Sequence, residues 1–196
     1  MNKSLIFPTN PKIDQTNYYW FENAFLDEEY YYINNLQELY PFEKATVIDD
    51  SVNTENQARK SEVKWLHHDE KSDWLYNKIE TLVVEANQTW GFDIYSIKDS
   101  IQYTEYYEGG GHYNWHMDAG PFPINNRKIS ITIQLSDPNE YVGGDLEMWT
   151  GNGIQSCPRQ KGAAVLFPSY MLHRVTPVSS GTRKSLVLWV GGSPYR

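Results

Sequence analysis

The sequence has little cysteine, few cations and no long apolar run. Its single cysteine, Cys157, excludes an internal disulfide and is typical of a reducing compartment, so we expect a cytoplasmic protein. Lysine and arginine number 17 against 25 acidic residues, and this net charge of -8 argues against nucleic acid as a partner, because affinity for phosphates needs clustered cations. No stretch approaches the roughly 20 apolar residues that span a bilayer, and residues 1–8 lack the apolar run of a signal peptide, so we expect no membrane partner.

Two helices are predicted in the first half of the chain. The first opens at Asp27, which can cap its N-terminus, and ends before Pro41. The second covers residues 71–90 and stops at Gly91. Their apolar stripes are Tyr31, Ile33, Leu36 and Leu39 in the first helix, and Leu75, Ile79, Leu82, Val83 and Ala86 in the second.

The pattern of the chain changes once, near residue 95. After this point short alternating runs are broken by Gly, Pro, Asn and Asp, which indicates strands and turns. The length of 196 residues suits one domain with one core. We therefore expect one compact α+β domain, with a helical support region over 1–95 and a β-rich catalytic core over 96–196.

Two of the predicted strands separate their side chains by face. In residues 127–135 every odd position from Ile129 is aliphatic, whereas Ser130, Thr132 and Gln134 share the opposite face. In residues 183–190 the same alternation places Arg183, Ser185, Val187 and Trp189 together. One face of each strand is therefore expected to pack, and the other to border a polar cavity.

Two histidines and an aspartate carry the most specific chemistry. His116 and Asp118 are two residues apart, so on an extended strand both point the same way, and His173 is a distant third ligand. Two imidazoles and one carboxylate on one face of an octahedral ion leave three positions open, as in non-haem Fe(II) oxygenases. Arg183, ten residues after His173, would taken alone be a solvated charge at a strand end, but this spacing favours a role in the site.

A resemblance to a known family rests on four segments in order. They are Tyr107–Asp118, Leu135–Leu146, Gly162–Ser169 and His173–Leu186. Through them the chain resembles the prolyl 4-hydroxylase branch of the 2-oxoglutarate/Fe(II) dioxygenases, including the small bacterial hydroxylases of the PiuC/YbiX type. A fainter likeness covers Arg59–Ser61 and Trp65–Leu66. The resemblance implies a double-stranded β-helix, a jelly-roll or cupin-like barrel, with N-terminal support helices.

The resemblance also implies roles for individual residues. His116, Asp118 and His173 would be the iron ligands and the catalytic centre. Arg183 would pair with the far carboxylate of 2-oxoglutarate, which suits a guanidinium fork better than a lysine. The remaining cofactor-binding positions would be Tyr107 as a hydrogen-bond donor to the co-substrate, Ser130 where relatives often have threonine, and Trp189 as an aromatic wall of the pocket. Tyr103 and Tyr106 are alternatives to Tyr107.

The resulting hypothesis is an enzyme that hydroxylates an unactivated C–H bond with Fe(II), 2-oxoglutarate and O2, with ascorbate as an added reductant in relatives. The substrate expected is a prolyl residue of a peptide or protein, or a related amino-acid side chain. The alternative is a catalytically silent jelly-roll module that binds a protein through an aromatic groove. A nucleobase demethylase is disfavoured because that group carries two arginines on its last strand. The oligomeric state is left open.

Other histidines, the single cysteine and two loop segments are weaker candidates for a functional role. His112 is expected at the rim of the pocket and not as a ligand, and His67 and His68 have no partner at ligand spacing. Cys157 has no nearby histidine to activate it as a nucleophile. Two segments are candidate lids over the substrate, Gly109–Gly111 and Asp49–Asn56, although the glycines could equally make only a tight turn.

Overall fold

The computed structural model describes residues 17–45, 58–97, 99–121, 124 and 126–194, which form two helices and a predominantly antiparallel β-structure. The helices are α1 (Asp27–Gln37) and α3 (Asp73–Trp90). The strands before residue 100 are β1 (Tyr19–Phe21), β2 (Glu43–Lys44), β3 (Arg59–Lys60), β4 (Glu62–Leu66) and β5 (Ile94–Ile97). The later strands are β6 (Ile101–Tyr107), β7 (Gly111–His116), β8 (Arg127–Gln134), β9 (Tyr141–Gly143), β10 (Leu146–Trp149), β11 (Ile154–Ser156), β12 (Ala164–Pro168) and β13 (His173–Gly192).

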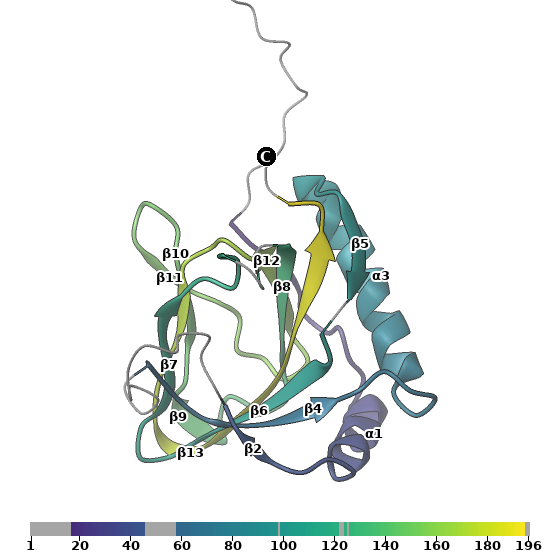
Figure 1. Cartoon of the computed structure of the whole chain (residues 1–196). Coiled ribbons are helices and arrows are strands. Elements are labelled where there is room, and N and C mark those ends of the chain that lie inside the picture. The colour runs from purple at the N-terminus through teal and green to yellow at the C-terminus, as the bar shows by residue number, and fades with distance from the viewer. Residues whose placement is uncertain (1–16, 46–57, 98, 122–123, 125, 195–196) are drawn as a thin grey trace, which may run out of the picture.

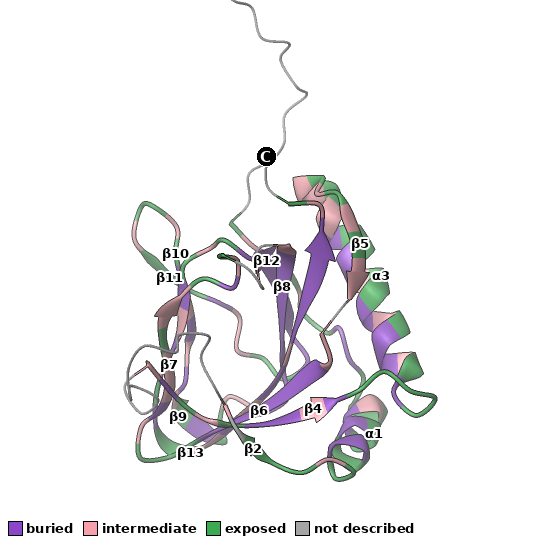
Figure 2. Cartoon of the chain, in the orientation of Figure 1, coloured by how far each residue is buried: buried purple, intermediate pink, exposed green. Residues whose placement is uncertain are grey.

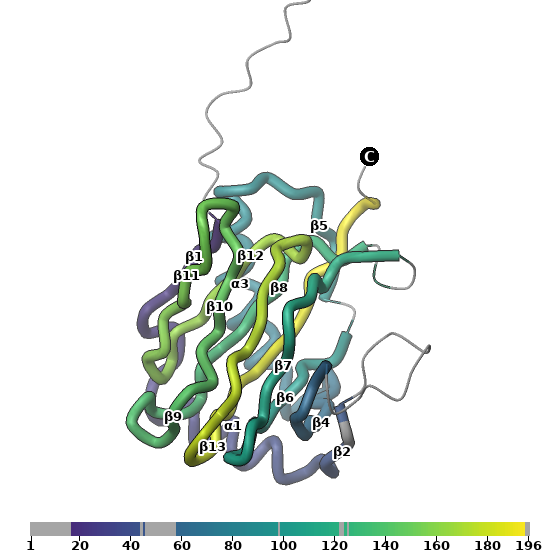
Figure 3. Tube along the Cα trace, turned by 90° about the vertical axis from the view of Figure 1, so that its left-hand side faces the viewer, coloured from purple at the N-terminus to yellow at the C-terminus, as the bar shows by residue number. Residues whose placement is uncertain are grey.

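The strands form two sheets that share the long strand β13. The first sheet has the order β1-β12-β8-β13-β6-β4-β2, and β5 also pairs with β13. In the second sheet the first half of β13 pairs with β7, β9 and β10, while β3 pairs with β7 and β11 with β10. Figure 1 shows both sheets with the two helices on the outer side of the first, and Figure 3 shows β10, β13 and β7 side by side. The expectation of an α+β fold with a β-rich second half is confirmed at this level.

Helix α1 forms where predicted but presents a different stripe. Leu26 precedes the helix and Asp27 is its first residue, so the expected cap at Asp27 is wrong by one position. The backbone N–H of Leu26 instead donates to the Glu29 carboxylate at 2.6 Å. Tyr31 and Leu39 are 66% and 57% exposed, and the buried positions are Tyr30, Ile33, Leu36 and Gln37. The helix is rotated about its axis so that Tyr30, Ile33 and Leu36, and not Tyr31 and Leu39, pack into the core against the sheet.

Helix α3 confirms the predicted second helix and its end. Gly91 follows it with a φ of 64°, a left-handed conformation that glycine adopts without steric cost. The buried side of α3 comprises Leu75, Tyr76, Ile79, Val83 and Ala86, while Leu82 is partly buried. These side chains share one core cluster with Ile129, Ile131 and Ile133 of β8. Each fully buried aliphatic side chain of this kind contributes about 1.5–3 kcal/mol, so this cluster anchors the helix to the sheet.

The alternation along β8 and β13 sends opposite faces to different environments, as predicted. The odd-numbered isoleucines of β8 pack beneath the helices, whereas Thr132 borders a cavity together with Arg183, Ser185 and Trp189 of β13. A second, smaller core holds side chains from both sheets: Tyr106, Tyr141, Leu146, Met148, Cys157, Val165, Phe167, Val175 and Val178. Figure 2 shows the central strands as the most deeply buried part of the chain.

The first 95 residues contribute more than support helices. Strands β4 and β2 extend one edge of the first sheet, β1 extends the other edge, and β3 adds to the second sheet. Short strands such as β2 and β3 carry too few residues for a periodic pattern, which explains why the sequence did not indicate them. The boundary at residue 95 stays a prediction. Neither described helix is long and apolar enough to span a bilayer.

Candidate metal centre

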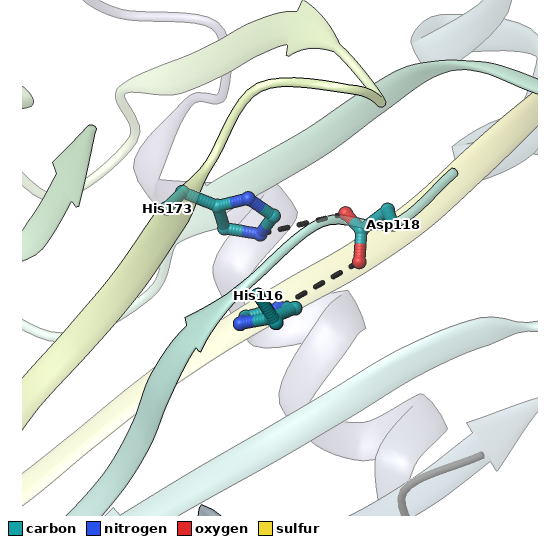
Figure 4. A group of neighbouring side chains, drawn as sticks. All are labelled: His116, Asp118 and His173. Carbon is teal, nitrogen blue, oxygen red and sulfur yellow. Dashed lines mark ion pairs between the residues drawn. The ribbon is translucent and has the colours of Figure 1, made fainter. Parts of the chain in front are cut away.

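Three predicted ligands converge at one end of the paired strands β7 and β13. His116 is the last residue of β7, and His173, the first residue of β13, is its direct partner across the pair. Asp118 follows β7 and reaches both rings: His116 Nε2 lies 3.7 Å from Asp118 Oδ1, and His173 Nε2 lies 3.5 Å from Asp118 Oδ2. Figure 4 shows both imidazoles turned toward the carboxylate. Strand pairing therefore joins ligands that are far apart in the sequence.

Backbone carbonyls orient both histidine rings. The Nδ1 of His116 donates to the Asn114 carbonyl at 2.7 Å, and the Nδ1 of His173 donates to the Met171 carbonyl at 2.8 Å. With Nδ1 protonated, each neutral ring carries its lone pair on Nε2, the nitrogen that faces Asp118. This is how metal-binding histidines are commonly held.

Asp118 is buried and held as a carboxylate. Burial favours its neutral form, but the positive charge that His173 and His116 carry when protonated, together with the Ser130 hydroxyl, outweighs this and lowers the pKa of Asp118. Ser130 Oγ donates to Asp118 Oδ2 at 2.6 Å and lies 2.9 Å from Ser169 Oγ. By donating this hydrogen bond, the Ser130 hydroxyl fixes the orientation of the Asp118 carboxylate, and therefore the direction of the carboxylate lone pairs.

His116 is held as a neutral imidazole. Burial lowers the pKa of His116 to about 3, with His173 adding to the effect and Asp118 opposing it. The Tyr113 ring stacks on the His116 ring with centroids 3.5 Å apart and planes 17° from parallel. A neutral, oriented imidazole is the form that binds a metal ion.

The donor set fits a divalent transition-metal ion. The ligand atoms of His116, Asp118 and His173 all lie within 4.8 Å of one another, and they form the one such group found among the described residues. Ligands on one face of an octahedral ion lie about 3 Å apart for bonds of about 2.1 Å, so small side-chain rotations would bring these atoms to one ion. Two imidazoles and one carboxylate suit Fe(II) with open positions.

A cavity of about 270 Å³ lies beside the triad and contains a buried cation. Arg183 is 1% exposed, and its Nη2 donates to Gln134 Oε1 at 3.0 Å and its Nη1 to Ser185 Oγ at 3.3 Å. Its Nε has no hydrogen-bond partner among the described residues. Within the same residues no carboxylate lies within 4.0 Å of it. A buried guanidinium that lacks an anion is costly unless a ligand supplies one.

Of the three further positions expected to bind the co-substrate, Trp189 borders the cavity, Ser130 contacts Asp118 without lining the cavity, and Tyr107 does not line it. Trp189 borders the cavity and is the direct partner of Ser130 across β8 and β13. Tyr107 points away from the cavity and donates to Glu105 at 2.5 Å and to Glu62 at 3.1 Å. Tyr106 takes the cavity position instead, because it is the register partner of Arg183 on β6. Because neighbouring residues of a strand point to opposite faces, Tyr106 borders the cavity and Tyr107 faces away from it, contrary to the prediction from the sequence.

Sequence reasoning missed several residues of the site, four of which bear on its chemistry. Arg59, Tyr113 and Arg127 border the cavity, and Gly144 approaches Arg183 so closely that an added Cβ would lie 3.0 Å from Arg183 Cδ. Gly144 also has a φ of 65°, where a side chain is strained. Tyr113 and His116 are three residues apart, so a regular strand would place them on opposite faces. The register of β7 against β13 shifts between these two positions, and the sequence does not indicate this irregularity.

The remaining candidates lie outside the triad. His112 Nδ1 bonds the Gly110 carbonyl at 2.7 Å, His67 contacts Ser100 and His68 contacts Asp73. Burial raises the pKa of Cys157 to about 12, which disfavours a nucleophilic thiolate.

The two segments predicted as lids differ in whether the structure describes them. Gly109 and Gly110 have φ values of 84° and 95° in the turn between β6 and β7, so the turn requires glycine whether or not it moves. The predicted lid Asp49–Asn56 lies outside the described residues.

The chain is a predominantly antiparallel β-structure that presents two histidines and an aspartate beside a buried arginine. Residues 101–191 match the family model of the 2OG-Fe(II) oxygenase superfamily. Its members use Fe(II), 2-oxoglutarate and O2. The match includes all three ligands and Arg183.

Curated relatives share the same region. The chain is 42% identical over 89 residues to a PKHD-type hydroxylase of Teredinibacter turnerae, which covers 43% of this chain and 39% of the relative. It is 38% identical over 90 residues to a PKHD-type hydroxylase of Pseudoalteromonas atlantica, and this match covers 43% of this chain and 40% of the relative. The matched region therefore spans about two fifths of these relatives.

Solved structures share the fold at low sequence identity. A prolyl hydroxylase of Trichoplax adhaerens, solved with a peptide fragment of the hypoxia inducible factor oxygen degradation domain, aligns with a TM-score of 0.75 and 18% identity over 92% of this chain and 86% of that one. A viral collagen prolyl hydroxylase of Paramecium Bursaria Chlorella virus-1 aligns with a TM-score of 0.68 and 19% identity over 92% and 99%. The likeness extends to the N-terminal half, which the family model leaves out.

Proposed function

We propose that the protein is an Fe(II)- and 2-oxoglutarate-dependent dioxygenase that hydroxylates an unactivated C–H bond. The observation that carries the proposal is the buried Arg183, which has no anionic partner among the described residues and borders the same cavity as the His116, Asp118 and His173 triad. A metal site alone would not require a buried arginine. A dicarboxylate co-substrate that binds the metal with one end requires the arginine for its other carboxylate.

His116, Asp118 and His173 would hold the iron, and the bound iron would supply the oxidative chemistry. The reaction consumes the substrate, 2-oxoglutarate and O2, and yields the hydroxylated substrate, succinate and CO2. The three side chains leave half of an octahedral ion open for exchangeable ligands. Ser130 would keep Asp118 oriented, and the Asn114 and Met171 carbonyls would keep both Nε2 atoms directed at the ion.

Arg183 would receive the distal carboxylate of 2-oxoglutarate. Its guanidinium is fixed by Gln134 and Ser185, so little freedom is lost when the anion binds. The unused Nε–H and the planar fork suit a bidentate carboxylate. Tyr106, whose ring centroid lies 5.4 Å from the Arg183 Cζ, replaces Tyr107 as the tyrosine placed to contact the co-substrate.

No general base is required of the protein, because hydrogen is removed from carbon by the oxidant. The side chains around the triad instead position the reactants and exclude water. Trp189 and Val187 of β13, with Val63 and Trp65 of β4, give the cavity apolar walls.

The proposed fold is the double-stranded β-helix, or jelly-roll. The two sheets joined by β13 and the antiparallel pairing of all their strands support this topology. In it, α1 and α3 act as the support helices on the outer face of the first sheet.

The substrate proposed is a prolyl residue of a peptide or protein, or a related amino-acid side chain. The names of the similar proteins, prolyl hydroxylases and PKHD-type hydroxylases, support this class. Ascorbate dependence and a cytoplasmic location stay predictions of the sequence.

Aerobic incubation with Fe(II) and 2-oxoglutarate tests the proposal, with succinate measured over time. An oxygenase is expected to form succinate slowly without substrate, and His173→Ala is expected to abolish it. His68→Ala, an exposed histidine that contacts Asp73, is the matched control and should retain the rate. A catalytically silent protein-binding module would form no succinate with any peptide offered, and that result would reject the proposal.

A further inference from the structure

A second arginine in the cavity has no acidic partner among the described residues. Arg59, Arg127 and Arg183 all border it. Arg127 is paired with Asp99 through contacts of 2.7 and 3.2 Å, and the proposed function assigns Arg183 to 2-oxoglutarate. For Arg59 no carboxylate of the described residues lies within 4.0 Å. The cation therefore has no role in the function proposed so far.

Arg59 is held firmly and is shielded from bulk solvent. It is 8% exposed, and its Nε donates to Ser61 Oγ at 2.8 Å. Its Cζ lies 4.7 Å from the centre of the Tyr113 ring, its register partner across β3 and β7. One nitrogen is thus used for positioning, and the rest of the fork is set in place before any ligand binds.

The position of Arg59 is close to the metal ligands but separate from Arg183. The Tyr113 ring that lies under Arg59 also stacks on His116 at 3.5 Å. Arg59 belongs to a strand of the second sheet, whereas Arg183 lies where β13 pairs with β6 of the first. The two cations therefore approach the reaction centre from different sheets.

The balance of charge in the cavity favours an anionic substrate. A divalent ion and Arg183 would be offset by Asp118 and the two carboxylates of 2-oxoglutarate, which leaves Arg59 as the cavity cation without a counter-charge from the described residues. Glu43 is the other carboxylate that borders the cavity, but it is exposed at the rim and forms no ion pair with Arg59. A buried charge of this kind is stabilised when a ligand brings its counter-ion.

We propose that Arg59 binds a carboxylate of the substrate, so that the protein selects amino acids or peptides with a carboxylate close to the hydroxylated carbon. The planar fork of arginine is suited to two parallel hydrogen bonds with a carboxylate. This inference rests on the proposed function, because it takes Arg183 as occupied by 2-oxoglutarate. The carboxylate can come from a chain terminus or from an acidic side chain.

Binding of matched acid and amide probes tests the proposal. The probes are free proline and proline-containing tripeptides, each with a terminal carboxylate or a terminal amide, and the same tripeptides with Asp exchanged for Asn and Glu for Gln. Their binding is measured by calorimetry on protein loaded with Mn(II) and 2-oxoglutarate, which does not turn over. We expect at least one acid probe to bind roughly 10- to 100-fold more tightly than its amide, the range for a charge-assisted hydrogen bond. The terminal and side-chain pairs identify the source of the carboxylate.

Substitution of Arg59 then assigns the preference to this residue. In Arg59→Gln the ratio between acid and amide should fall close to one, and Arg59→Lys should retain part of it. Lys60→Gln is the matched control, since it removes the adjacent cation, which contacts the Gly109 carbonyl, and should leave the ratio unchanged. Equal binding of acid and amide by the native protein, or no binding of any probe, overturns the proposal even if the Arg59 variants fail to fold. A ratio that survives in Arg59→Gln also overturns it.

The failure of this inference can be told apart from the failure of the proposed function. Binding of Mn(II) and of 2-oxoglutarate is measured first in the same protein. If both bind and no acid probe is preferred, only the role of Arg59 is rejected. If neither binds, the triad and Arg183 are at fault.

Discussion

The Ser130 hydroxyl donates a hydrogen bond of 2.6 Å to Asp118 Oδ2, although the two residues lie twelve positions apart and on different elements. Ser130 belongs to the polar face of β8, and Asp118 follows β7, which is paired with β13 and β3. The bond joins the one anionic member of the triad to β8, an internal strand of the first sheet that pairs with β12 and β13. The position of the Asp118 carboxylate is thereby fixed by the sheet.

Removing this hydroxyl should weaken metal binding. In Ser130→Ala the carboxylate loses its fixed orientation, and we expect Fe(II) or Mn(II) affinity to fall about 10- to 100-fold, the usual effect of losing a partner behind a ligand. Titration of the metal followed by calorimetry measures the change. Ser130→Thr keeps the hydroxyl and should bind metal nearly as well as the native protein. Unchanged affinity in Ser130→Ala would show that Asp118 is oriented by other contacts.

Replacing Arg183 should separate co-substrate binding from metal binding. Arg183→Ala removes the cation proposed to pair with 2-oxoglutarate, so we expect a loss of about 2–5 kcal/mol in 2-oxoglutarate binding with the metal affinity retained. Lys184→Ala, the next residue, points to the outer face near Glu105 and should bind 2-oxoglutarate normally. Native affinity in Arg183→Ala would refute the assignment.

The two adjacent tyrosines of β6 should differ in their effects. Tyr106→Ala removes a buried ring beside Arg183 and is expected to lower 2-oxoglutarate affinity about tenfold or more. Tyr107→Phe removes only hydrogen bonds to Glu105 and Glu62, so it should leave this affinity within about twofold and reduce the free energy of unfolding by about 1 kcal/mol. Fluorescence titration and urea unfolding supply the measurements. The reverse order of effects would restore the sequence assignment of Tyr107.

The buried His116 should make the metal-free protein less stable in mild acid. Its pKa is about 3 when folded against an ordinary value of 6.5, so below pH 6.5 the unfolded chain binds a proton that the folded one does not. The free energy of unfolding should therefore fall as the pH drops, by about 1–2 kcal/mol between pH 6.5 and pH 5.

Urea unfolding in the presence of a chelator measures this dependence. His116→Asn should flatten the slope over the window, while His68→Asn, which changes an exposed histidine, should not. Asp118 has a lowered pKa and loses its stabilising effect in the same direction, but at lower pH than this window. An equal slope in the native protein and His116→Asn would mean that His116 titrates normally.

Local sequence patterns predict the types of ligand and the two faces of strands β8 and β13. The alternation in β8 separates the isoleucines from Ser130, Thr132 and Gln134, because period-two patterns follow directly from the geometry of an extended chain. The spacing of His116 and Asp118 predicts one strand for both residues, but β7 ends at His116 and Asp118 lies beyond it. The ends of α3 were also readable, since Gly91 supplies the left-handed residue that stops a helix.

Contacts between residues on different strands depend on the long-range pairing of those strands. Pairing of β7 with β13 brings His116 beside His173, and pairing of β3 with β7 sets Arg59 over Tyr113, although β3 has only two residues and no pattern of its own. Register also chose Tyr106 over Tyr107, because a shift of one residue turns a side chain to the opposite face of a sheet. Such contacts depend on long-range pairing and bulges, which local periodicity does not encode.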